Sequence, residues 1–269
     1  MSCGESQSLE VVTLRRIRYN DKRSVLTVWS RQHGRVSLVI NDQGTGRTAT
    51  RLRALTMPVS IVECRAVGRP DTDLLTASQF SVVTPLPGLH LHPVKGMIAT
   101  FVAEVAYTML RQNAPDDAIW YYLTGALQYL DAATSSAAIA SFPAVFLFRL
   151  ASVLGIAPDV GDYAPGKLLD VVAGRFGFSV SGDSRVLNRE ESRLIAMLGK
   201  LDFTNMDGAE WGRAERNSAL DLMLGYFSLH MSTPVELKST TVLRSIFDAR
   251  PSAAVLDNGA IGVHKADTP

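Results

Sequence analysis

Hydrophobic and polar positions alternate along the first third of the chain, and they recur at helical spacing beyond it. Five runs rich in β-branched and aromatic residues are predicted to be strands, at residues 9–19, 24–30, 35–40, 59–67 and 74–83. Five short strands joined by turns fit a small closed barrel. The five-stranded OB-fold is the leading interpretation, and an SH3-like barrel fits the strand count almost as well.

Beyond residue 84, apolar residues recur at three- and four-residue steps, the spacing of one face of a helix. Pro93 suits a first helical turn, and the stripe that follows it is Val94, Met97, Ile98, Phe101, Val105 and Met109. Asn188 followed by Glu191 predicts a capping box that opens another helix. Because Pro143 lies inside one periodic segment, we expect that helix to begin near the proline. The further helices are predicted at 116–131, 137–154, 211–231 and 240–247.

These patterns predict an α+β chain with two domains. An OB-fold barrel is expected over residues 1–84 and an all-α domain over 85–250. Residues 159–182 contain five Gly and one Pro, which predicts an irregular insert, with a short hairpin around 175–180. The Ala-, Gly- and Asp-rich residues 251–269 are predicted to be a disordered tail.

Charge changes this picture because it is unevenly distributed. The net charge of the chain is +1, yet residues 1–69 contain 12 Lys and Arg against 5 Asp and Glu. The remaining residues contain 15 basic and 21 acidic side chains. A basic first domain on an acidic second one suggests that the first contacts polyanions.

The strongest basic feature is a Gly- and Arg-rich segment between the third and fourth strands. Arg47, Arg51 and Arg53 fall within seven residues there, with no acid nearby. A flexible basic loop on a barrel can follow a phosphate backbone, although an ordinary solvated loop would have the same composition. The predicted DNA-binding residues are Arg35, Arg47, Arg51, Arg53, Lys22 and Arg23. Trp29 is a possible stacking residue, but its apolar strand favours the core.

Other function classes find little support in the sequence. Cys3 and Cys64 cannot form a zinc site alone, and His90 and His92 have no nearby ligand partner, so no metal is predicted. No phosphate-binding loop or hydrolase motif occurs, so neither enzymatic activity nor a cofactor is expected. The first ten residues do not have the pattern of a signal peptide. The longest apolar run, 142–158, is shorter than a bilayer span and carries Arg149, so a soluble cytoplasmic protein is predicted.

Three segments in this order resemble the RecO family of bacterial recombination mediators. They are VVTLRRIRYNDKRSVLTVWSRQHGRVSLVI, FLFRLASVLGIAPDV and LGYFSLHMSTPVELKSTTVLRSIF. The first combines an apolar strand, a tyrosine and polar turn, a second strand and the sequence His33-Gly34-Arg35-Val36. The resemblance spans residues 9–249.

The resemblance implies an N-terminal OB-fold and a C-terminal helical domain. It also implies binding of single- and double-stranded DNA, annealing of complementary strands, and binding of the acidic C-terminal tail of single-stranded-DNA-binding protein (SSB). RecR would be the partner with which the chain helps to load RecA, in the cytoplasm at the nucleoid. The alternatives are a generic OB-fold nucleic-acid-binding module and a protein adaptor.

Four further cations are candidates for the SSB tail or for a second DNA contact: Arg149, Lys238, Arg244 and Arg111. Arg149 interrupts an apolar helix, and the alternative is a structural arginine that caps a carbonyl group. Many family members carry two cysteine pairs in the insert, whereas this chain has none there, so it resembles a zinc-free branch. The insert is therefore expected to be held by apolar residues, namely Leu168, Val171, Phe176 and Phe178.

Overall fold

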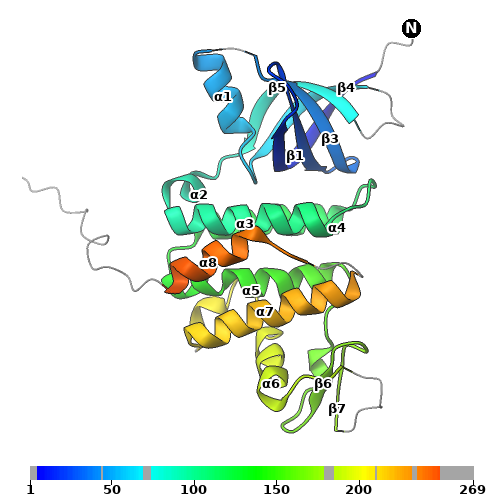
Figure 1. Ribbon diagram of the computed structural model, residues 1–269, viewed down its shortest axis with the longest axis vertical. Coiled ribbons are helices and arrows are strands. Elements are labelled where there is room, and N and C mark those ends of the chain that lie inside the picture. Colours follow the sequence, from blue (N-terminus) through cyan, green and yellow to red (C-terminus); the bar gives the residue numbers. More distant parts are fainter. Residues whose placement is uncertain are drawn as a thin grey trace, which may run out of the picture.

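The five strands between Glu5 and Thr84 form a closed barrel. A computed structural model describes residues 5–43, 45–68, 74–178, 185–209, 211–231 and 235–248. The strand order around the barrel is β1-β2-β3-β5-β4, with β3 and β5 parallel and the other pairs antiparallel (Figure 1). This confirms the predicted OB-fold. The strands are β1 (Glu5–Arg18), β2 (Arg23–Ser30), β3 (Gly34–Asn41), β4 (Ile61–Gly68) and β5 (Leu74–Thr84).

Alternation along the strands places one set of side chains inside the barrel. The interior cluster is Leu9, Val11, Leu26, Val28, Val36, Leu38, Ile40, Val62, Cys64, Ala66, Leu75, Ala77 and Phe80. Cys64 lies among them as the predicted small apolar residue, and its burial raises the pKa of the thiol to about 12. At physiological pH this cysteine is therefore an uncharged core residue.

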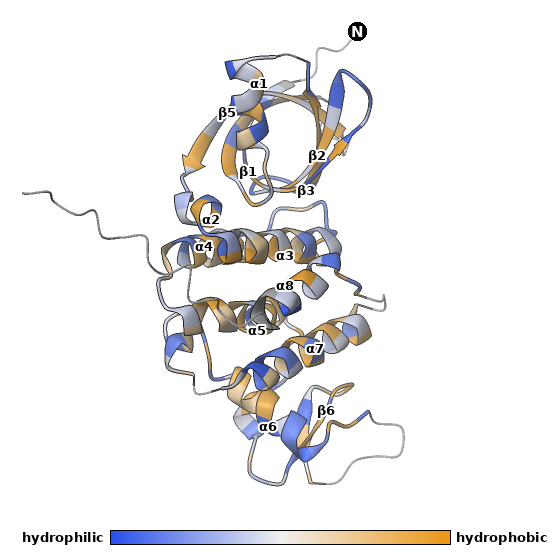
Figure 2. Cartoon of the chain, turned by 60° about the vertical axis from the view of Figure 1, so that its left-hand side comes forward, coloured by the Kyte–Doolittle hydropathy of each residue, from blue (hydrophilic) through white to orange (hydrophobic). Residues whose placement is uncertain are grey.

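The prediction of a flexible basic loop between β3 and β4 is wrong in one respect, because this segment contains a helix, α1 (Arg47–Leu55). Gly46 precedes it with φ of 86°, a conformation that glycine adopts without strain. Leu52 and Leu55 pack against the interior cluster, so α1 lies against the barrel (Figure 2). Burial of these two leucines, rather than local propensity, explains a helix in a segment rich in Thr and Gly.

The helical region begins with a short helix that the sequence did not predict, α2 (Pro87–Leu91). The expected stripe after Pro93 is confirmed, since Ile98, Phe101, Val105 and Met109 are buried in α3. The remaining helices are α3 (Pro93–Met109), α4 (Asp117–Ala132), α5 (Ser136–Val153), α6 (Arg189–Leu198), α7 (Arg213–His230) and α8 (Lys238–Asp248). In Figure 1 they lie in layers below the barrel, with α3 and α4 uppermost.

Helix α5 begins earlier than predicted. Its first residue is Ser136, and Ser135 caps it by accepting a hydrogen bond from the Ala138 backbone N–H. Pro143 therefore lies inside the helix, in a buried position where neighbouring helices hold the chain. Among the described residues, α5 is the one helix long and apolar enough to cross a membrane. Two thirds of it (67%) is buried within the helical region, as in a core helix.

The insert contains a hairpin of β6 (Leu168–Asp170) and β7 (Arg175–Gly177). This hairpin begins before residues 175–180, where it was expected. Phe176 is buried, as expected, whereas Phe178 is 73% exposed and does not hold the insert. The 3-10 turn Val160–Asp162 precedes the hairpin. The capping box of Asn188 and Glu191 is confirmed at the start of α6. The tail at 251–269 lies outside the described residues.

The barrel and the helices share one apolar core. Val12, Trp29 and Val59 of the barrel side belong to the same buried cluster as α3 and α5. Trp29 is 0% exposed, which confirms its place in the core and excludes it as a stacking platform. Val59 has φ of 59°, an unusual conformation for a β-branched residue, and its N–H donates to the Thr13 carbonyl at 2.7 Å. The junction is therefore tightly packed.

Candidate nucleic-acid interface

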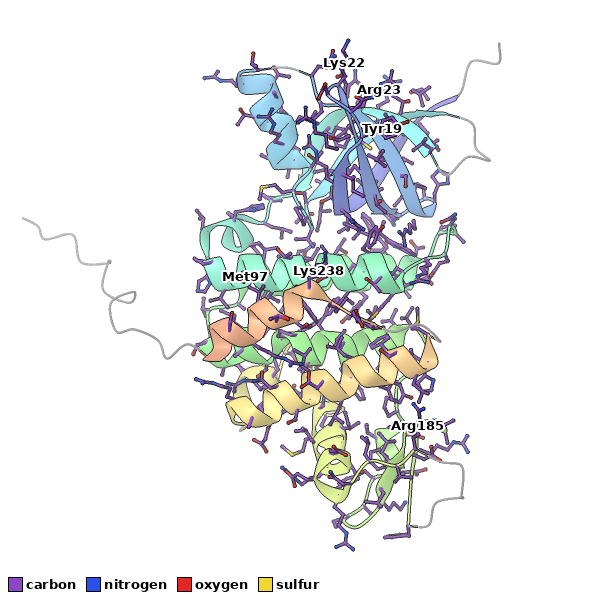
Figure 3. All side chains as sticks on the ribbon, viewed as in Figure 1. Tyr19, Lys22, Arg23, Met97, Arg185 and Lys238 are labelled. Carbon is purple, nitrogen blue, oxygen red and sulfur yellow. The ribbon has the colours of Figure 1, made fainter. Side chains whose placement is uncertain are left out.

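The predicted basic residues around α1 and the β1–β2 turn are all exposed. Lys22 and Arg23 lie in a turn that is held by Asn20, whose Oδ1 accepts from their backbone N–H groups at 2.9 and 2.8 Å. Figure 3 shows both side chains at the barrel end farthest from the helical region. We call Arg47, Arg51 and Arg53 the α1 cations.

Two of the α1 cations, Arg47 and Arg51, do not favour the helix, whereas Arg53 lies in its last turn, where a cation is stabilising. Arg47 and Arg51 are four residues apart, where like charges on a helix repel. The first turn of α1 contains no acidic residue. Arg53 contributes to the low pKa of Asp42, but hydrogen bonds from Arg16 and Ser24 are the larger causes. The arrangement leaves these guanidinium groups available for an external anion.

Ion pairing separates the basic residues of the barrel into two classes. Arg16, Arg18 and Arg31 form ion pairs with Asp42, Asp21 and Glu10 respectively. Arg31 also faces Asp117 at 3.6 Å. Within the part of the chain that the structure describes, no ion pair is formed by Lys22, Arg23, Arg35, Arg47, Arg51 or Arg53. The six residues predicted from sequence all belong to the class without a carboxylate partner, and so do Arg15 and Arg65 among the described residues.

Arg35 does not lie with the other five. Its guanidinium lies over the ring of Tyr107 in α3, 4.5 Å from the centroid, and its Nη1 donates to the Tyr107 carbonyl at 2.9 Å. The Arg35 backbone N–H donates to the Gln112 carbonyl at 3.0 Å. Arg35 is therefore a half-buried residue of the junction between the barrel and the helices.

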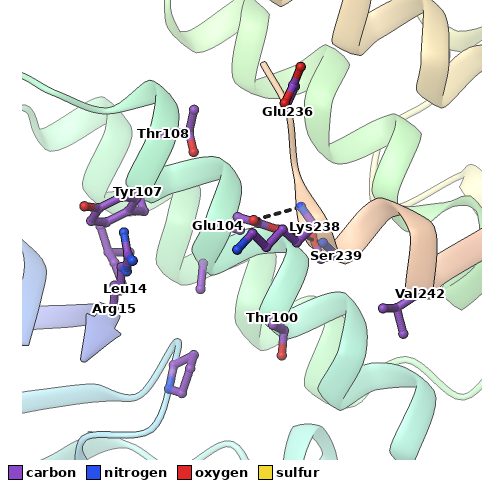
Figure 4. Close-up of a pocket in the computed structure, with 12 residues that line it drawn as sticks. Leu14, Arg15, Thr100, Glu104, Tyr107, Thr108, Glu236, Lys238, Ser239 and Val242 are labelled. Carbon is purple, nitrogen blue, oxygen red and sulfur yellow. Dashed lines mark hydrogen bonds between the residues drawn. The ribbon is translucent and has the colours of Figure 1, made fainter. Parts of the chain in front are cut away.

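A groove of about 560 Å³ lies at this junction, and we call it the junction groove (Figure 4). Arg15 enters it from β1 and also lies over the Tyr107 ring, 4.8 Å from the centroid. Lys238 enters it from α8, on the other wall. The lining residues are Leu14, Arg15, Pro58, Thr100, Ala103, Glu104, Tyr107, Thr108, Glu236, Lys238, Ser239 and Val242.

The carboxylate of Glu104, which lines the groove, is hydrogen-bonded to the start of α8. Its carboxylate accepts from the backbone N–H groups of Lys238 and Ser239, both at 2.9 Å, and from the Ser239 hydroxyl at 2.6 Å. Partial burial opposes the charged form, but these hydrogen bonds outweigh it and lower the pKa of Glu104. Glu104 therefore caps α8, and no ion pair joins it to Arg15 or Lys238 in the described chain.

The structure divides the second predicted set of cations. Lys238 lines the junction groove, and Arg111 donates from Nε to the carbonyl of Thr108, another lining residue, at 3.0 Å. Arg149 donates to the carbonyls of Leu201 and Gly199 just beyond α6, which fits the structural alternative. Arg244 forms an ion pair with Asp221. Lys238 and Arg111 are thus the two members of the set at or next to the groove, whereas Arg149 and Arg244 are engaged elsewhere.

Sequence reasoning missed an exposed row on β1. Arg15 and Ile17 share one face of β1, and Tyr19 follows at the same two-residue step just beyond the end of the strand; we call the three the β1 row. Tyr19 is 74% exposed and Ile17 is 46% exposed. The signal was present as alternation, but it was hidden by Arg16 and Arg18, which point elsewhere and are ion-paired.

Metal binding has no geometric basis in the described residues, which contain no group of three or more His, Cys, Asp or Glu side chains suited to an ion. His92 instead accepts at Nδ1 from the Lys95 backbone N–H, at 3.4 Å, at the start of α3. His90 is exposed.

Comparison with known proteins decides the family. The family model described as recombination protein O, C terminal, matches residues 92–240, and the model described as recombination protein O, N terminal, matches residues 6–86. The chain belongs to the RecO family. The two models meet where the barrel ends and the helices begin.

Curated relatives of this RecO chain carry the name DNA repair protein RecO. The one from Phocaeicola vulgatus is 29% identical over 236 residues, covering 88% of this chain and 97% of the relative. Those from Bacteroides fragilis and Porphyromonas gingivalis are each 28% identical, with the same coverage of both chains. The family gives this chain a role in DNA repair and recombination.

Proposed function

We propose that the chain is a non-enzymatic mediator that binds single- and double-stranded DNA and anneals complementary strands. The observation that carries this proposal is the set of barrel cations without a carboxylate partner, chiefly Arg47, Arg51 and Arg53. Such cations bind phosphates by releasing counterions. Neutralising the charge of two strands lowers their mutual repulsion, so base pairing between them becomes faster.

We further propose that the helical region recruits protein partners, namely the C-terminal tail of SSB and RecR, and so assists loading of RecA. Arg149 and Arg244 are the candidate contacts of the SSB tail. This role places the protein in the cytoplasm at the nucleoid.

The test is annealing of complementary strands coated with SSB, with and without this protein. Intact SSB is compared with SSB that lacks its tail. We expect acceleration with intact SSB and a much smaller effect without the tail. If the protein binds no DNA and accelerates annealing in neither case, the mediator proposal is wrong, and a protein adaptor becomes the better interpretation.

A further inference from the structure

The junction groove continues the β1 row. Arg15 belongs to both, since it is the first residue of the row and also lines the groove. From Arg15 the exposed side chains run through Ile17 to Tyr19, a path of about 13 Å at the rise of a strand. The path ends beside the turn that carries Lys22 and Arg23 (Figure 3). A charged groove is thus extended by an aliphatic and an aromatic side chain along one strand.

Arg15 in the groove, and Arg35 beside it, are held in position before any ligand arrives. Arg15 and Arg35 both lie over the Tyr107 ring, at 4.8 and 4.5 Å from its centroid. Two carboxylates, Glu104 and Glu236, also line the groove. Glu104 hydrogen-bonds to the start of α8 and forms no ion pair with Arg15 or Lys238, although its charge acts on Lys238. Arg15, Arg35, Arg111 and Lys238 form no ion pair within the described residues. Cations that are ordered but unpaired favour a polyanion.

The α1 cations form a separate surface. Arg47 and Arg51 lie on the first half of α1, at the barrel end farthest from α3 (Figure 1). The groove lies at the other end, where β1 meets α3. Helix α1 packs against β5, which is not a neighbour of β1 in the barrel.

We propose that the junction groove and the β1 row bind a second single strand of DNA while the α1 cations hold the first, so that one chain carries two strands. This inference rests on the proposed function and adds the place of the second strand. An extended row that combines phosphate-binding cations with an exposed tyrosine suits unpaired bases, which stack on aromatic rings whatever their sequence. Annealing then begins from two strands that one protein chain holds near each other.

The experiment counts strands per chain. Two non-complementary oligonucleotides with different dyes are mixed with the full-length protein, and the complexes are resolved by sedimentation with detection of both dyes and of protein. For the native sequence we expect complexes that contain one chain and both dyes. For Arg15→Ala/Lys238→Ala we expect one strand per chain, bound through the α1 cations with an affinity within about threefold of the original.

A matched control separates this effect from loss of charge alone. Lys167→Ala/Arg193→Ala removes two charges of the helical region that the groove does not use, since Lys167 donates to the Asp162 carbonyl and Arg193 pairs with Glu190 and Glu215, and it should still carry two strands. In the control the salt slope of second-strand binding should equal that of the native chain, of which about 1.4 corresponds to the two phosphate contacts of Arg15 and Lys238 on a single strand. The annealing rate of the groove variant should fall at least about tenfold, while the control should anneal normally.

Three results would overturn the inference. One is a native chain that binds only one strand, and another is a complex of two chains with one strand each. The third is a groove variant that still carries two strands. If that variant no longer bound an acidic peptide, the groove would be a peptide-binding site instead. Failure of the native protein to bind any DNA is a different outcome, because it would remove the proposed function itself.

Discussion

Arg35 of the barrel donates to the backbone carbonyl of Tyr107 in the helical region while its guanidinium lies over the same residue's ring. The two contacts bind β3 to α3 at the point where the groove begins. A residue predicted to contact DNA therefore also joins the two domains, and substitutions can separate these roles.

Replacing Arg35 by Lys tests the separation. Lys keeps the positive charge but cannot donate and stack in the same geometry, so the free energy of unfolding should fall by about 1–2 kcal/mol while DNA affinity changes little. Arg35→Ala should reduce both the free energy of unfolding and the affinity for DNA. Urea unfolding and DNA titration of the two variants measure these effects. A Lys variant that is fully stable yet fails to bind DNA would contradict the structural role.

Gly34→Ala should destabilise the junction strongly. Gly34 has φ of 67°, and a Cβ there would lie 2.2 Å from the carbonyl oxygen of Ala114. We expect a loss of more than about 2 kcal/mol, because left-handed strain adds to a backbone clash. Gly46→Ala is the matched control, since Gly46 has φ of 86° but nothing within 4 Å of the added atom. The control should lose about 1–2 kcal/mol from strain alone.

Replacing Arg47, Arg51 and Arg53 together by Ala should weaken DNA binding without unfolding α1. The slope of log affinity against log salt should become shallower by about 2 for single strands. Circular dichroism should show an intact helix, since Ala favours helix and repulsion between Arg47 and Arg51 is removed. Arg18→Ala, which breaks an exposed ion pair with Asp21, should leave the slope nearly unchanged. Equal slopes in all three proteins would show that α1 does not contact phosphate.

Glu104 should make the attachment of α8 sensitive to acid. Its pKa is lowered in the folded chain, so its stabilising effect is present above the ordinary value of 4.5 and is lost as pH falls through the folded value. Glu104→Gln should reduce stability at pH 7 by about 0.5–1 kcal/mol, because the group is partly solvated. The difference between the two proteins should shrink as pH falls below 4.5 and disappear once Glu104 is protonated in the folded chain. Thermal melts across this range measure it, and a constant difference would be evidence against the charged cap.

The sequence predicted the elements whose pattern is local. Alternation located all five strands, and the three- and four-residue stripe located α3. It did not predict α1, because Thr and Gly lower helix propensity and the two leucines that stabilise it pack on residues distant in the chain. It placed the start of α5 too late, because the rule that proline breaks helices gives way when tertiary packing holds the helix.

The same distinction applies to the interface. The exposed arginines of α1 could be predicted, since clustered cations without acids are visible in the sequence. The sequence could not predict that Arg35 lies apart from these arginines, because its position depends on contacts with Tyr107, 72 residues further along the chain. For Arg149 the sequence did offer an interpretation that fits the contacts, namely an arginine that caps carbonyl groups.

The shared core of barrel and helices has a mechanical consequence. Trp29 and Val59 are packed in the same cluster as α3, so the domains cannot pivot about a flexible linker without exposing large apolar side chains. The spacing between α1 and the junction groove is therefore set by the fold itself. A rigid body of this kind would not close around DNA like a clamp, and would present two strands at a fixed separation to any partner that binds it.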